Sequence, residues 1–118
     1  MKTPEIKLPD KLRRKIELLT EDFPRIVEME RQGRVNYDVF DCGAYKCAWG
    51  WVKSWRPAVN ELDIKLMWDF NLAAQTYYGF TTNDVDKIFG GEECGPTEDR
   101  IKYLQDLIHE ELQVLGVG

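Results

Sequence analysis

The sequence predicts an all-α protein, a single compact bundle of five or six helices around a central tryptophan-rich helix. Three observations lead to this prediction. Apolar residues recur at intervals of three and four along most of the 118 residues. One segment, residues 43–55, is apolar around almost its whole circumference and needs cover from several neighbours. No linker or internal repeat divides the chain, so residues 1–118 are expected to form one helical domain, large enough to bury a core without disulfides or metals.

The central helix is expected to run from about Gly43 to Trp55. Asp41 is suited to cap its start, and Pro57 prevents its continuation. At about 3.6 residues per turn, its polar side chains fall in one narrow strip and leave the rest of the surface apolar. Its three tryptophans supply most of the area that it can bury, roughly 150–250 Å² each. We therefore expect these indoles to fill the interior of the bundle.

The other helices are expected where apolar residues at helical spacing lie between a capping residue and a glycine or proline. Their expected ranges are residues 9–23, 24–31, 60–78, 82–89 and 97–115. Thr81 and Thr97 are assigned as N-caps, and Asp84 forms a weak capping box with Thr81. Alternation of apolar and polar residues over 34–40 indicates a short extended segment that lies over the core or forms half of a small ribbon.

The central segment resembles a known signature. It reads Cys42-Gly-Ala-Tyr-Lys-Cys47-Ala-Trp-Gly-Trp51, and the signature Cys-Gly-Thr-x-x-Cys-x-x-Gly-Trp is found in a group of uncharacterised small bacterial and phage proteins. The similarity extends through a Gly-x-Thr turn at residues 79–81 and covers roughly residues 35–108. It departs at Ala44, where the group usually has threonine, and at Trp49, where the group has a small residue. The resemblance implies a helical layout and an intracellular setting, and it transfers no activity.

Charge and composition limit the classes of function. The net charge of −5 is unevenly spread, because residues 1–56 carry a net +3 and residues 57–118 a net −8. An acidic second half argues against nucleic acid as a partner, since neutralising phosphates requires clustered Lys and Arg. It suits contact with a basic protein surface. No apolar run or leader segment is evident, so we expect no membrane partner, a cytoplasmic location and reduced cysteines.

No catalytic constellation is evident either. The single histidine has no serine or cysteine visibly placed for activation, and the Gly90-Gly91 pair lacks the Lys-Ser/Thr of a phosphate-binding loop. We therefore expect a non-enzymatic protein without a cofactor that acts through protein–protein contact, its oligomeric state open. Small phage and bacterial proteins are often host-directed inhibitors, so one hypothesis is an inhibitor of a host nucleic-acid-handling defence complex. The expected partner contacts are Asp84, Asp86, Glu92, Glu93, Glu98 and Asp99.

Two other classes of function remain open. Residues 72–89 have the outline of a helix-turn-helix DNA-binding regulator, although the second helix carries two aspartates against one lysine. A Cys₃His zinc site is the other alternative. Its candidate ligands are Cys42, Cys47, Cys94 and His109. The surplus of aromatic residues also leaves open whether some of them reach the surface and anchor a partner in place of the acidic side chains. The candidates are Trp49, Trp68, Tyr45, Tyr77 and Tyr78.

Overall fold

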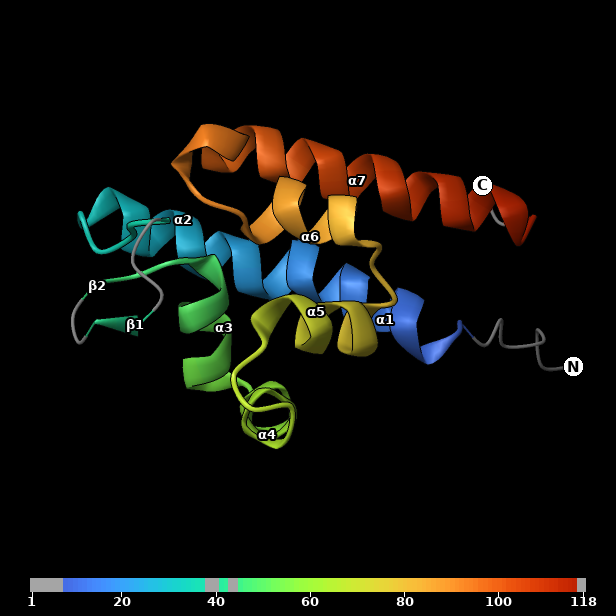
Figure 1. Ribbon diagram of the computed structural model, residues 1–118. Coiled ribbons are helices and arrows are strands. Elements are labelled where there is room, and N and C mark those ends of the chain that lie inside the picture. The colour runs from blue at the N-terminus through green and yellow to red at the C-terminus, as the bar shows by residue number, and fades with distance from the viewer. Residues whose placement is uncertain (1–7, 38–40, 43–44, 117–118) are drawn as a thin grey trace, which may run out of the picture.

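The computed structural model describes residues 8–37, 41–42 and 45–116. These residues form seven α-helices, one π-helical segment, one 3-10 turn and two short strands (Figure 1). The predicted all-α class is confirmed. The helix count rises to seven because the helix expected over residues 60–78 is divided in two.

The N-terminal helices form one continuous rod instead of two separate elements. α1 (Asp10–Glu17) continues through the π-helical segment η1 (Leu18–Asp22) into α2 (Phe23–Arg31). The second helix expected from Asp22 and Pro24 is present, since α2 begins at Phe23 with Asp22 as its N-cap, but the π-helical segment joins it to α1 without a loop. Proline has no N–H, and its ring meets the carbonyl of the fourth residue before it in an α-helix. The wider π-turn, in which the Phe23 N–H donates to the Leu18 carbonyl, changes the hydrogen-bond register just ahead of this proline.

The central tryptophan-rich helix is shorter than expected. α3 spans Ala48–Trp55, and its N-cap is Cys47 rather than Asp41. The residues before it form a small antiparallel ribbon of β1 (Asp41–Cys42) and β2 (Tyr45–Lys46). β2 has a second backbone partner in the extended segment, because Val35 forms a parallel bridge with Lys46. The two pairings of β2 favour a strand here over a further turn of α3. The predicted extended segment is found at Val35, and its residues 38–40 lie outside the described residues.

Two of the three tryptophans of α3, Trp49 and Trp51, fill the interior, as predicted, whereas Trp55 is only partly buried. Trp49 is fully buried and Trp51 is 7% exposed. The Trp49 ring meets the ring of Phe89 edge to face at a centroid distance of 5.4 Å. Its Nε1 lies 3.3 Å from Oδ1 of the buried Asp63, whose other oxygen lies 3.0 Å from Lys53 Nζ. The core indole is therefore held by both packing and a buried polar contact.

The helix expected over residues 60–78 is broken into α4 (Pro57–Lys65) and α5 (Phe70–Tyr78). The break is a Schellman turn, in which the N–H of Trp68 donates to the Asp63 carbonyl at 2.8 Å and that of Met67 to the Ile64 carbonyl at 3.0 Å. Met67 and Trp68 both have left-handed backbones, with φ values of 59° and 63°. Asp69 then caps α5, since its Oδ1 accepts from the Leu72 N–H at 3.1 Å.

Glycine is the residue normally found at the position of Met67, because a left-handed conformation costs an L-residue about 1–2 kcal/mol. The Met67 side chain is 82% exposed and contributes little packing. We expect Met67→Gly to raise the free energy of unfolding by up to about 1 kcal/mol, the relief of strain being partly offset by the entropy of glycine in the unfolded chain. Urea denaturation measures this difference.

Glu61→Gly provides the matched control, since Glu61 is exposed in the middle of α4. There glycine replaces a residue in a right-handed helix and should lower stability by about 0.5–1 kcal/mol. A loss of stability in both variants would contradict the assignment of strain to Met67.

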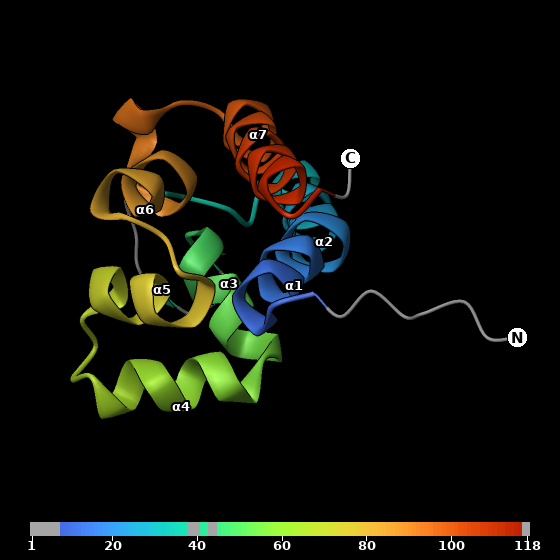
Figure 2. The same cartoon turned by 90° about the vertical axis from the view of Figure 1, so that its right-hand side faces the viewer.

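The C-terminal half completes the bundle. α6 (Thr82–Phe89) begins with the predicted capping box between Thr81 and Asp84, and η2 (Glu92–Cys94) leads into α7 (Thr97–Val114). α7 runs antiparallel along the α1–α2 rod (Figure 1). Viewed from the end of the rod, α4, α5 and α6 lie on one side of it and α7 lies above it (Figure 2). Thr97 is the first helical residue and not the cap, which is Pro96, so its hydroxyl is available for other contacts.

Candidate functional site

The predicted acidic contacts fall into two kinds. Asp84 is used by the fold: its Oδ2 accepts from the Thr81 N–H at 2.9 Å, and its Oδ1 accepts from the Tyr103 hydroxyl at 2.7 Å. We therefore leave it out of the candidate surface. Exposed carboxylates remain on α6, on η2 and in the first turn of α7, where negative charge also complements the helix dipole. They belong to Asp86, Glu93, Glu98 and Asp99, whereas the side chain of Glu92 lies outside the described residues.

The described members of the candidate zinc site do not come together. Cys47 is buried as the N-cap of α3, and burial raises the pKa of its thiol. Cys94 is half-buried in η2, and His109 is exposed near the end of α7, where its Nε2 lies 3.1 Å from Nε2 of Gln113. The side chain of Cys42 lies outside the described residues. Within the described part of the chain, no three His, Cys, Asp or Glu side chains are grouped to hold a metal ion.

α5 and α6 form the predicted helix pair around the turn at residues 79–81, but the start of α6 is attached to α7. The Tyr103 hydroxyl lies 3.3 Å from Nδ2 of Asn83 and donates to Asp84. The exposed side of α6 also carries Asp86 beside Lys87. In helix-turn-helix proteins, residues at the N-terminal end of the second helix contact base edges. Here Asn83 and Asp84 occupy that end and are hydrogen-bonded to Tyr103, so the geometry does not favour the helix-turn-helix alternative.

A groove lies between α2 and α7, made of two adjoining hollows of about 320 and 280 Å³ that share Glu30 and Pro96. We call it the α2–α7 groove. The first hollow lies toward the extended segment, and the second lies between the helices. The groove is lined by Val27, Glu30, Val35, Tyr37, Gly95, Pro96, Thr97, Glu98 and Ile101.

A short polar chain orients one carboxylate of this groove. The Thr97 hydroxyl donates to Oε2 of Glu30 and also contacts the Tyr37 hydroxyl. Since the only hydroxyl proton of Thr97 goes to Glu30, Tyr37 must donate to Thr97. Burial raises the pKa of Tyr37, so its phenol stays protonated and keeps this role at neutral pH. Glu30 is thereby held at the point where the two hollows meet.

The wall of the groove at Gly95 is positioned by Arg100, a fully buried residue of α7. Its guanidinium donates to four backbone carbonyls, those of Ile88 at 3.2 Å, Gly90 at 2.6 Å, Gly91 at 2.6 Å and Gly95 at 2.9 Å. Its central carbon lies 3.7 Å from the centroid of the Tyr37 ring. Burial lowers the pKa of Arg100, although a guanidinium remains charged at neutral pH. One side chain therefore fixes both the loop after α6 and the aromatic floor of the groove.

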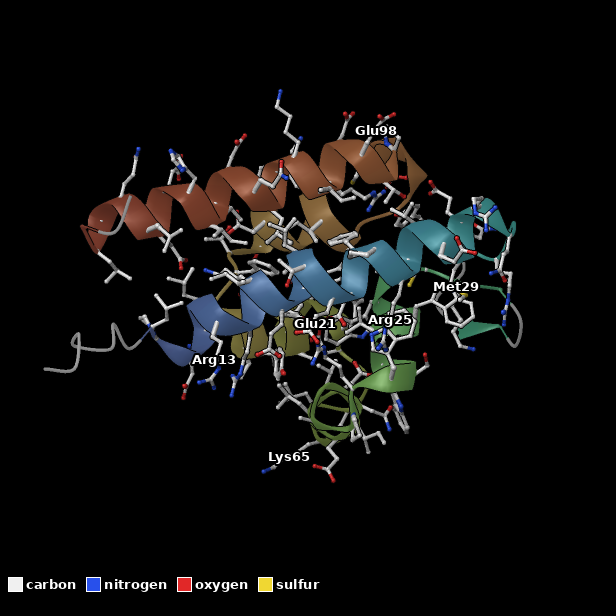
Figure 3. The ribbon with its side chains drawn as sticks, turned by 180° about the vertical axis from the view of Figure 1, so that it is seen from behind. Arg13, Glu21, Arg25, Met29, Lys65 and Glu98 are labelled. Carbon is white, nitrogen blue, oxygen red and sulfur yellow. The ribbon has the colours of Figure 1, made fainter. Side chains whose placement is uncertain are left out.

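Two carboxylates, those of Glu30 and Glu98, line the groove, and no lysine or arginine is found among its described lining residues. Val27 is 42% exposed and supplies an apolar wall together with Ile101. Figure 3 shows Glu98 at the start of α7. Glu98 was anticipated from charge alone. Glu30, Tyr37 and Thr97 were not, because they meet only through the packing of α2 against α7.

No helix in the described ranges combines the length and the apolar character needed to cross a lipid bilayer. Comparisons with protein-family models, with curated proteins and with solved structures find no match. The functional assignment therefore depends on the geometry of the α2–α7 groove.

Proposed function

We propose that this protein is a non-enzymatic binding module that takes a basic segment of a partner protein into the α2–α7 groove. The observation that carries the proposal is the pairing of Glu30 and Glu98 with apolar walls in a groove whose described lining has no cation. Lysine and arginine combine an apolar stem with a charged head. The stem fits against Val27 and Ile101, while the head reaches the two carboxylates.

The remaining exposed acids act at longer range. Asp86, Glu93 and Asp99 add to the negative potential around the groove without lining it. Such a field mainly increases the rate of encounter with a positively charged partner and is screened by salt. We therefore expect binding that weakens as ionic strength rises.

A basic surface that accepts these carboxylates is also the kind of surface that binds phosphates. If the partner handles nucleic acid, occupation of its phosphate-binding residues by Glu30 and Glu98 would exclude the nucleic acid. This mechanism extends the proposal to an inhibitor of a nucleic-acid-handling defence complex, the role suggested by the resemblance to small phage and bacterial proteins. The groove itself requires only a basic, partly apolar segment.

The test uses a fluorescent peptide of alternating lysine and leucine as the probe and measures its binding by anisotropy. We expect the double variant Glu30→Gln/Glu98→Gln to weaken binding at least tenfold, or about 1.4 kcal/mol, because both charged contacts are lost. In ¹⁵N-resolved NMR titrations, the wild-type shifts should concentrate at Glu30, Thr97 and Ile101.

A matched control removes the same two charges elsewhere. Glu61→Gln/Asp106→Asn changes exposed acids on α4 and α7 that do not line the groove. This variant should bind within about twofold of the wild type, a difference of about 0.4 kcal/mol. Equal weakening in both double variants would show that only net charge matters and would overturn the assignment to the groove.

A further inference from the structure

The turn between α4 and α5 displays large apolar side chains that the fold does not bury. Met67 is 82% exposed and Trp68 is 64% exposed, and their neighbours Ile64 and Leu72 are 51% and 44% exposed. We call these four residues the Met67–Trp68 knob. Its two central residues are held in left-handed backbone conformations that methionine and tryptophan rarely adopt. Strain of this kind, combined with an exposed tryptophan, is characteristic of binding sites.

A hollow that suits such a knob is present at another part of the same molecule. It has a volume of about 380 Å³ and lies where the start of α1 meets the end of α7. Its wall is largely apolar, and Val114 and Leu115 are 88% and 47% exposed. The volume lies in the range of pockets that enclose a drug-sized ring system. This α1–α7 hollow is lined by Pro9, Leu12, Glu110, Glu111, Val114 and Leu115.

The charges beside the two surfaces are complementary. Lys65, exposed at the end of α4, lies between Ile64 and Met67 of the knob in sequence, and Figure 3 shows it projecting away from the body of the molecule. On the rim of the hollow, Glu111 is paired with the buried Lys15, whereas Glu110 is exposed to solvent. A second copy of the chain therefore offers both an apolar pocket for Trp68 and an acidic group for Lys65.

We propose that the Met67–Trp68 knob of one copy binds in the α1–α7 hollow of a second copy, with Lys65 facing Glu110. The hollow is lined by the start of α1 and the end of α7, and Figures 1 and 2 show these elements apart from the α4–α5 turn. The contact is consequently head-to-tail, and a pair joined by it still has one unoccupied knob and one unoccupied hollow. Because few side chains take part, the interface is smaller than the roughly 1,200–2,000 Å² of stable complexes, and association needs high protein concentration.

Sedimentation equilibrium over a series of concentrations tests the proposal with the full chain. The weight-average mass of the wild type should rise above the monomer value of 13.8 kDa as concentration increases. Trp68→Ala removes the knob, and Val114→Asp places a charge in the hollow. Both positions are exposed, so both variants should fold normally and stay monomeric.

Mixing the two variants gives the decisive measurement. Trp68→Ala keeps an intact hollow and Val114→Asp an intact knob, so an equimolar mixture should form a pair of two chains and nothing larger. Glu110→Lys should weaken wild-type association, and adding Lys65→Glu in the same chain should restore it. A wild type that stays at 13.8 kDa at every concentration, or a mixture that stays monomeric, would overturn the proposal.

Discussion

Replacement of Arg100 by methionine is expected to lower the free energy of unfolding by about 3–5 kcal/mol. Arg100 is fully buried and donates to four carbonyls, and its hydrogen bonds to those of Ile88 and Gly90 are themselves buried. Each buried carbonyl left without a donor costs about 1–3 kcal/mol, and partial relaxation of the loop limits the sum. Contact with the Tyr37 ring is lost as well. Urea denaturation followed by circular dichroism measures the change.

Lys102→Met is the matched control for this prediction. It removes the same charge from the same helix, but Lys102 is exposed, so the effect should stay within about 0.5 kcal/mol. Arg100→Lys should lower the free energy of unfolding more than Lys102→Met does and less than Arg100→Met does. An ammonium group is a point donor and cannot reach four separated carbonyls. If Arg100→Met and Lys102→Met were equally stable, the hydrogen bonds from Arg100 to the four carbonyls would not stabilise the fold.

The same substitution should loosen the groove. Without the guanidinium, residues 88–96 lose the contacts that hold their carbonyls inward, and Tyr37 loses the group beneath its ring. Amide exchange in this loop should therefore be faster in Arg100→Met than in the wild type.

Local features of the fold were predictable from sequence because they depend on neighbouring residues. Thr81 and Asp84 form their capping box with no help from distant elements. Gly79 ends α5 with a left-handed backbone of φ 74°, which glycine adopts without strain. The indole of Trp49 is buried because an apolar segment must be covered wherever it lies.

Sequence reasoning missed two boundaries, the end of α4 and the start of α3. No glycine or proline marks the break at Met67, so the apolar spacing of residues 60–78 is compatible with one uninterrupted helix. Asp69 was the available signal, since aspartate favours N-caps. The ribbon before α3 is formed by the antiparallel pairing of residues 41–42 with residues 45–46 and by the bridge from Val35 to Lys46. Neither pairing can be read from the helical spacing of apolar residues.

The candidate site was only partly predictable for the same reason. Glu98 stands out because acidic residues accumulate in the second half of the chain. Glu30 lies in a half that is basic overall, and Thr97 has the ordinary pattern of a helix cap. Their contact requires α2 and α7 to pack in one particular register. Nothing in the local sequence indicates this register.

Truncation of the central indole should have a similarly large effect. Trp49→Ala is expected to lower the free energy of unfolding by about 3–5 kcal/mol, because a fully buried ring leaves a cavity that the surrounding helices cannot fill. The edge-to-face contact with Phe89 disappears, and Asp63 loses the donor on its Oδ1. Trp49→Phe retains most of the volume and should recover much of the loss, apart from that hydrogen bond.

Trp68→Ala is the matched control, because it makes the same substitution at an exposed position. Trp68 is 64% exposed, so its truncation at low protein concentration should change stability by no more than about 0.5 kcal/mol. The difference between the two variants separates burial from the general consequences of removing an indole. Comparable losses of stability at both positions would mean that burial of Trp49 is not what stabilises the core. A large loss at Trp49 alone would place the origin of stability in the interior.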